Sequence, residues 1–144
     1  MNPIWLASYP RSGNTLVRTI LYQCMDLKTG SVYSNDLGGN SNLESYVGHI
    51  EQSEDRSIAF PEGSLPIIKT HAHHEGNNKT IYVVRDGRAA AASLWEFTNP
   101  KVTMTNIIEG VHKFGVWHDH IEAWDPLSRP NTLLLKYEDI LMNF

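Results

Sequence analysis

The sequence predicts an α/β domain built on a central parallel sheet, and two observations support this fold class. Short apolar or β-branched runs of strand length alternate with segments of helical periodicity. The first run, PIWLAS at residues 3–8, is largely apolar, as is typical of a parallel strand buried on both faces. At 144 residues the chain is long enough to bury one core, so we expect a single domain over residues 1–144.

The first strand leads through a short turn into a predicted helix over residues 12–25. Apolar residues recur there every fourth position, with further apolar residues beside them, which defines one buried helix face. These positions are Leu16, Val17, Ile20, Leu21 and Cys24. Strand, tight turn and helix together form the opening of a βα unit.

Residues 26–66 have a different composition. Gly, Ser and Asn are concentrated in residues 28–42, which predicts a loop, and residues 43–52 are expected to form a short helix. A long irregular segment inside a compact domain is more often functional than idle. We therefore expect this region to act as a lid or a binding loop.

Regular structure returns in the second half of the chain. Residues 65–71, LPIIKTH, and residues 80–84 predict two strands, and an alanine-rich helix follows from Asp86, a plausible N-cap. Residues 104–124 carry apolar residues at the spacing of one long helix. Residues 131–140 predict a last strand that runs into another helix.

Charge and composition exclude several classes of function. The formal net charge is −4 and the pI is about 5.9, so no global basic field is available to bind nucleic acid. Cys24 is the only cysteine, which precludes an internal disulfide and fits a reducing compartment. No apolar stretch has the length of about 18 residues that a membrane-spanning helix needs, and no signal-peptide pattern opens the chain. We therefore expect a cytoplasmic location, with neither a membrane nor nucleic acid as partner.

Polar and basic residues follow each predicted strand where that strand ends. In a parallel sheet these ends share one edge, and ligands bind there. The residues are Arg11, Ser12, Gly13, Asn14, Thr15, Lys69, His71, Arg85, Lys136 and Tyr137. Cations beside the free N–H groups of a helix N-terminus favour an anion such as phosphate, and an arginine can hold it with two parallel hydrogen bonds. The loop RSGNT, residues 11–15, is therefore interpreted as a phosphate cradle in which glycine permits close approach.

This cradle differs from the common phosphate-binding motifs. The sequence contains neither a G-x-x-x-x-G-K-[ST] P-loop nor a G-x-G-x-x-G Rossmann loop. By itself, the loop has an alternative interpretation as a polar turn in which Ser12 is the helix N-cap.

Several segments resemble the sulfotransferases that use 3'-phosphoadenosine 5'-phosphosulfate (PAPS). YPRSGNT, residues 9–15, resembles the 5'-phosphosulfate-binding loop of that family, usually written YPKSGTTW. IYVVRDGRAAAASLW, residues 81–95, resembles its 3'-phosphate-binding strand and helix, and PIIKTH, residues 66–71, resembles the strand that ends in the catalytic histidine. FGVWHDHIEAW and LLLKYEDI follow in the same order, so the resemblance runs from about residue 3 to residue 144 and is weakest at 26–62.

The resemblance implies a P-loop-NTPase-like three-layer fold, with helices flanking the sheet, and transfer of a sulfuryl group from PAPS to an acceptor hydroxyl or amine, releasing PAP. It implies His71 as general base, with Lys69 and Arg11 stabilising charge on the transferring group. The donor-binding residues that it implies are Arg11, Ser12, Gly13, Asn14, Thr15, Arg85, Ser93 and Tyr137. It implies no metal, and an acceptor that is a small molecule, a glycan or a peptide.

Each assignment has a simpler structural alternative. His71 could be solvated or bonded to a carbonyl, Ser93 could be a small residue packed among alanines, and Tyr137 could be an ordinary aromatic residue at a strand end. A group of histidines raises a metal site as a further alternative, which is disfavoured because no second pair has a familiar ligand spacing. These histidines are His71, His73, His74, His118 and His120.

The sequence departs from the family pattern in three places. Arg11 replaces a lysine, which keeps the charge but substitutes a planar fork that barely titrates. Leu16 stands where the family has an aromatic residue, usually Trp, that stacks on adenine. The sequence ends at Phe144 without a match to the family's R-K-G-x-x-G-x-W-K segment. We therefore expect a truncated or minimal variant, or a site completed by a second chain, such as a homodimer.

Two other functions remain open. A non-catalytic module would bind PAP or another nucleotide without transferring a group. An enzyme similar to a nucleotide kinase would use the same cradle for ATP, but the sequence lacks the P-loop lysine and a clear magnesium carboxylate.

Overall fold

A computed structural model of the protein describes residues 2–73 and 76–143. Its strands form one five-stranded sheet of order β2-β3-β1-β4-β5, and the paired strands all run parallel. The strands are β1 (Ile4–Ser8), β2 (Gly30–Ser31), β3 (Ile67–Thr70), β4 (Thr80–Val84) and β5 (Thr132–Lys136). The predicted α/β fold with a central parallel sheet is thereby confirmed.

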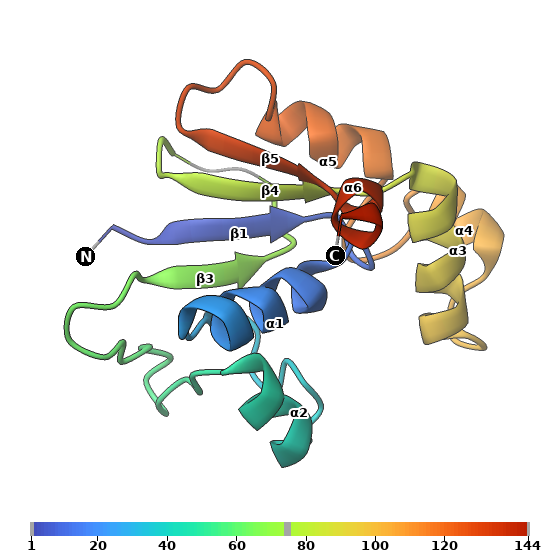
Figure 1. Ribbon diagram of the computed structural model, residues 1–144. Helices are drawn as coiled ribbons and strands as arrows, with labels where there is room; N and C mark the ends of the chain where they lie inside the picture. The colour runs from blue at the N-terminus through green and yellow to red at the C-terminus, as the bar shows by residue number, and fades with distance from the viewer. Residues whose placement is uncertain (1, 74–75, 144) are drawn as a thin grey trace.

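Helices cover both faces of the sheet and give three layers (Figure 1). The helices are α1 (Asn14–Met25), α2 (Ser41–Val47), α3 (Gly87–Thr98), α4 (Met104–Ile108), α5 (Trp117–Trp124) and α6 (Tyr137–Met142). Val17 of α1 packs with Leu6 on one face, and Trp124 of α5 packs with Ala7 on the other. Successive side chains of a strand point to opposite faces, so β1 is buried from both sides, as its apolar sequence predicts.

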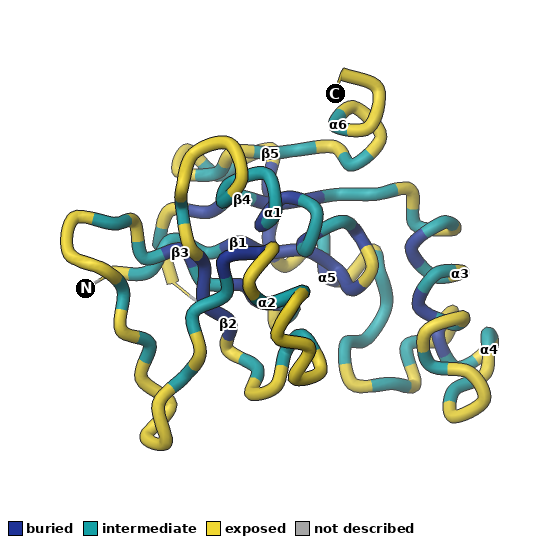
Figure 2. Tube along the Cα trace, turned by 60° about the horizontal axis from the view of Figure 1, so that its bottom comes forward, coloured by how far each residue is buried: buried dark blue, intermediate teal, exposed yellow. Residues whose placement is uncertain are grey.

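A third cluster extends the core beyond the carboxyl ends of the strands. Tyr9, just after β1, packs with Ala90 and Leu94 of α3 and with Ile107 of α4. Figure 1 shows α3 and α4 standing beyond the arrowheads of the strands. In Figure 2 buried residues concentrate in the sheet and at its contacts with the helices, whereas the loop before β3 is largely exposed. Among the described residues, no helix combines the length and apolarity needed to cross a lipid bilayer.

The prediction of one helix over residues 104–124 was wrong. The segment forms α4 and α5, separated by a turn in which Gly110 and Gly115 have φ values of 70° and 66°. A Cβ at Gly110 would lie 3.0 Å from the backbone nitrogen of Val116, so the chain folds back closely there. Ile107 of α4 packs in the cluster with Tyr9, where Trp117 of α5 joins it, whereas Trp124 of α5 packs with Ala7 against the sheet, so the apolar spacing did not reveal the break.

Smaller differences occur in the first half of the chain. The short helix predicted at residues 43–52 is α2, which begins at Ser41 and ends at Val47. The predicted loop contains β2, a two-residue strand on the edge of the sheet that is too short to produce a pattern. Asp86 is confirmed as the N-cap of α3, since its side chain accepts from the backbone N–H groups of Arg88 and Ala89.

Candidate active site

A cavity of about 790 Å³ opens at the carboxyl ends of the strands. It is lined by nearly all the residues selected from the sequence as a site. Those that line it are Arg11, Gly13, Asn14, Thr15, Lys69, His71, Arg85, Ser93 and Tyr137. Ser12 is buried beside it, and Lys136 is exposed outside it. The parallel sheet therefore gathers segments that are far apart in the sequence, as expected for strand ends that share an edge.

The turn between β1 and α1 has the backbone shape of a cradle. Arg11 and Gly13 have φ values of 65° and 100°. A Cβ at Gly13 would lie 2.5 Å from the ring of Tyr137, so only glycine fits beneath that ring. Gly13, not Ser12, is the N-cap of α1 and no side chain caps the helix, so the N-cap interpretation of the serine was wrong. The first N–H groups of the helix thus stay available to a ligand.

Two polar side chains of the turn behave differently. Ser12 is 1% exposed, and its Oγ has no hydrogen-bond partner among the described residues. Asn14 donates from Nδ2 to the carbonyl oxygen of Leu6 at 3.0 Å and to Ser8 Oγ at 3.2 Å. Both amide hydrogens of Asn14 therefore hold the helix to β1 and are not free for a ligand, contrary to the sequence-based expectation for this side chain. An unpaired buried hydroxyl like that of Ser12 calls for an explanation, and a bound anion would supply one.

Arg11 and Arg85 are held by neighbouring groups on one side of the cavity. Arg85 donates from Nη1 to the carbonyl oxygen of Arg11 at 2.9 Å, and its guanidinium carbon lies 4.5 Å from the ring centroid of Tyr137. Arg11 donates from Nε to Ser93 Oγ at 3.1 Å, and its guanidinium carbon lies 4.9 Å from the ring centroid of Phe97. Ser93 is thus a hydrogen-bond partner in the cavity and not merely a small residue packed among alanines. The two guanidinium groups form a local basic region in a chain of negative net charge.

Hydrogen bonds hold one ring nitrogen and the backbone N–H of His71. Its Nδ1 donates to the carbonyl oxygen of Ser8 at 2.7 Å, and its backbone N–H donates to the hydroxyl of Tyr33 at 2.9 Å. The carbonyl bond that the sequence left as an alternative therefore exists, but it occupies only Nδ1. A proton on Nδ1 leaves a lone pair on Nε2, and no described residue donates to it. Burial lowers the pKa of His71 to about 3, with the charge of Lys69 adding to the shift, so the ring is neutral at pH 7.

A second buried histidine fixes the backbone of the first. His120 donates from Nε2 to the carbonyl oxygen of His71 at 3.1 Å and accepts from the hydroxyl of Tyr82 on Nδ1 at 2.8 Å. The side chain is fully buried, and burial lowers the pKa of His120 to about 4. From the sequence, His120 was a candidate metal ligand only, whereas in the structure it positions the backbone of His71.

Because His120 is buried in its neutral form, we expect the domain to lose stability in acid. Between pH ~6.5 and about 4 the unfolded chain binds a proton that the folded chain does not, so the free energy of unfolding falls as the pH drops through this window. At about pH 5 this one group should lower that free energy by about 2 kcal/mol. Urea unfolding of the wild type and of His120→Gln at pH 5 and pH 7 measures it: the pH-dependent loss should shrink by that amount in the variant, and an equal loss in both proteins would contradict it.

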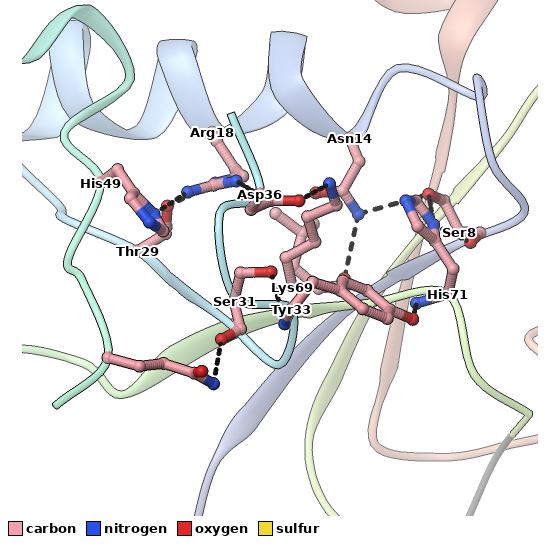
Figure 3. Close-up of polar contacts among 12 residues, drawn as sticks. Ser8, Asn14, Arg18, Thr29, Ser31, Tyr33, Asp36, His49, Lys69 and His71 are labelled. Atoms are coloured by element: carbon pink, nitrogen blue, oxygen red, sulfur yellow. Dashed lines mark hydrogen bonds and ion pairs between the residues drawn. The ribbon is translucent and has the colours of Figure 1, made fainter. Parts of the chain in front are cut away.

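Figure 3 shows an ion cluster next to His71 that sequence analysis did not predict. Asp36 accepts from Arg18 Nη1 on Oδ2 at 2.5 Å and from Lys69 Nζ on Oδ1. The side chains of Arg18 and Asp36 are 0% and 4% exposed. Burial alone would raise the pKa of Asp36, but the charges and hydrogen bonds of Lys69 and Arg18 hold it below its usual value. The cluster ties the loop before α2 to helix α1 and to strand β3.

Arg18 has further partners that complete its hydrogen bonding. It donates from Nε to Thr29 Oγ1 at 2.8 Å and from Nη2 to His49 Nδ1 at 2.7 Å. Because arginine only donates, Nδ1 of His49 is the acceptor, and Nε2 of that ring faces Glu51 at 3.2 Å. The sequence contains only a weak signal for the position of Arg18: the residue follows Asn14 by one helical turn and lies beside the apolar face of the predicted helix.

Aromatic rings form the wall of the cavity beside His71. The ring of Tyr33 stacks on His71 with centroids 5.8 Å apart, and the ring of Phe114 meets His71 edge-on at 5.6 Å. Lys113 places its ammonium 5.2 Å from the centroid of Tyr33 and 5.4 Å from that of Phe114. Tyr33 in the loop of residues 26–66 thus forms part of the cavity wall, and a role of this loop as a lid or binding loop stays a prediction.

The histidines weighed as metal ligands do not assemble into a metal centre in the part of the chain that the structure describes. No group of three or more His, Cys, Asp or Glu side chains within residues 2–73 and 76–143 is arranged to hold an ion. His74 lies outside the described residues.

Comparison with known proteins gives a consistent match along the whole sequence. The sulfotransferase domain family matches residues 1–144. Sulfotransferase 2B1 of Homo sapiens is 28% identical, and the match covers 95% of this chain and 41% of that protein. Sulfotransferase 4A1 of Mus musculus is 24% identical, covering 95% and 54%, and Sulfotransferase 1E1 of Mus musculus is 25% identical, covering 94% and 52%. The chain spans about half the length of the curated relatives it matches.

Proposed function

Because the chain belongs to the sulfotransferase domain family, we propose that it transfers a sulfuryl group from PAPS to a hydroxyl or amine of an acceptor and releases PAP. The observation that carries this proposal is the cavity itself. It joins an anion cradle at the N-terminus of α1 to a neutral histidine, His71, whose Nε2 is not engaged by any described residue.

The residues present fit the donor. Ser12 Oγ is buried with no partner among the described residues, Gly13 lets the ring of Tyr137 lie directly against the turn, and Arg11 and Arg85 supply positive charge. We assign the 5'-phosphosulfate to residues 11–15 and the 3'-phosphate to Arg85 and Ser93, with Tyr137 beside the adenine. PAPS, when bound, supplies the activated sulfuryl group.

The chain's own residues provide the acid–base and electrostatic parts of the reaction. Nε2 of His71 accepts the proton of the acceptor hydroxyl as the new oxygen–sulfur bond forms and the sulfur–oxygen bond to PAP breaks, with the electron pair of the broken bond leaving on PAP. Lys69 and Arg11 stabilise the negative charge that builds up during the transfer. Because arginine barely titrates, Arg11 acts through its charge and its hydrogen bonds, not as a proton donor to the leaving group.

A non-catalytic PAP-binding module is the second candidate, and two observations favour it. A pKa of about 3 makes His71 a weak base in the unliganded protein, and Lys69 is already engaged with Asp36. Binding of an anionic donor next to His71 would raise that pKa toward the working range. The two candidates therefore differ in transfer and not in PAP binding.

Calorimetric titration with PAP, with ATP as the comparison ligand, tests the donor site. We expect PAP to bind more tightly than ATP and Arg85→Ala to weaken PAP binding about 10- to 100-fold, because the variant removes charge-assisted hydrogen bonds to a phosphate. Arg88→Ala is the matched control, since this arginine is exposed and pairs with Asp86 outside the cavity. Equal affinity for PAP in the wild type and in Arg85→Ala would contradict the assignment.

A further inference from the structure

The cations that line the cavity differ in what they contact. Arg11 and Arg85 stand beside the cradle, whereas Lys69 and Asp36 form an ion pair in the wall near His71. Lys113 is the fourth cation that lines the cavity, and its ammonium lies beside the rings of Tyr33 and Phe114. The proposed function assigns the other three cations to the donor and the transferring group, and it gives Lys113 no role.

Lys113 is held near the reacting groups without being neutralised. Its ammonium contacts the rings of Tyr33 and Phe114, and both of these rings also contact the imidazole of His71. No ion pair joins Lys113 to a carboxylate among the described residues, in contrast to Lys69, which pairs with Asp36. The positive charge of Lys113 is thus available to a ligand and lies about one aromatic ring away from the proposed base.

We propose that Lys113 selects acceptors that carry an anionic group, such as a carboxylate, about one ring's width from the hydroxyl that receives the sulfuryl group. This inference rests on the proposed function. The acceptor would enter between Tyr33 and Phe114, present its hydroxyl to Nε2 of His71 and place its anion at the ammonium. The bonds made and broken are those of the transfer above: the proton goes to Nε2, the acceptor oxygen bonds sulfur, and PAP leaves.

A pair of matched acceptors distinguishes the effect of the acceptor's charge from the effect of its shape. 4-Hydroxyphenylacetate and its amide, 4-hydroxyphenylacetamide, have nearly the same shape, but only the first is anionic at pH 7. With PAPS as donor, we expect the wild type to show a KM about tenfold lower for the acid than for the amide, since charge-assisted hydrogen bonds are the stronger ones. Lys113→Met keeps an apolar stem against the two rings and should raise the KM of the acid to that of the amide, with PAP affinity unchanged. Lys101→Met removes an exposed lysine outside the cavity and is the control.

The possible outcomes are distinct. An equal rise of KM for both acceptors in Lys113→Met would show a disturbed aromatic wall and would overturn the proposal. A loss of PAP affinity would assign Lys113 to the donor and overturn it as well. If neither acceptor is sulfated, the proposed function fails on that pair, and titration of each compound onto the PAP-bound protein decides the inference separately. Tighter binding of the acid that is lost in Lys113→Met supports it, and absence of a preference in the wild type overturns it.

Discussion

Replacing His71 with alanine is expected to lower kcat for sulfuryl transfer by about 10²- to 10⁴-fold, the usual contribution of a positioned general base. The expectation rests on geometry: Nδ1 is held by the carbonyl oxygen of Ser8, so Nε2 is the nitrogen that can accept the acceptor's proton. PAP affinity should change little, because the donor is assigned to the loop of residues 11–15 and to Arg85. Steady-state turnover with PAPS, alongside calorimetry with PAP, measures both quantities.

His118→Ala is the matched control for that experiment. This histidine lies on α5, is exposed and does not line the cavity, so its loss should leave turnover unchanged. Unchanged turnover in His71→Ala would refute the role of the base. A wild type that binds PAP but transfers no group to any acceptor would instead favour the non-catalytic module, and the two results are therefore distinguishable.

The arrangement of the sheet could be predicted because its signals are local. An apolar strand such as residues 4–8 must be covered on both faces, and a parallel sheet with helices on either side is the fold that does this. The break between α4 and α5 was not predicted, because periodicity reports which residues face a core and not whether the backbone is continuous. The two glycines at 110 and 115 were the only local signal of the turn.

The candidate site was likewise predicted in part and missed in part. Arg11, Lys69, His71 and Arg85 were found because each follows a strand, and parallel strands bring such residues to one edge. Asp36 was missed because it lies in a loop rich in Gly, Ser and Asn, where neither period nor spacing indicates which side chain turns inward. Its position depends on contacts between three segments, and contacts of this kind are not encoded in any one of them.

Replacing Arg18 with methionine is expected to lower the free energy of unfolding by about 3–5 kcal/mol, the usual cost of breaking a buried ion pair by removing one partner. Methionine fills much of the same volume but donates no hydrogen bond. Asp36 would keep only Lys69, and Thr29 and His49 would lose the hydrogen bonds that they accept from the guanidinium. Urea unfolding of the wild type and the variant at pH 7 measures the difference.

The same substitution at Arg88 provides the control for Arg18→Met. Arg88 also pairs with an aspartate, at 2.9 Å, but its side chain is 94% exposed, so Arg88→Met should leave stability unchanged within error. A loss at Arg18 no larger than the loss at Arg88 would show that the cluster contributes little to the fold.

With the expected loss of stability in Arg18→Met, Asp36 would be less firmly held against Lys69 and α1, so the loop that carries Tyr33 should become more mobile. Because the hydroxyl of Tyr33 accepts from the backbone N–H of His71, amide hydrogen exchange at His71 should then be faster in Arg18→Met than in Arg88→Met. Unchanged exchange at His71 in a destabilised Arg18→Met would mean that the cluster supports the fold without supporting the proposed base.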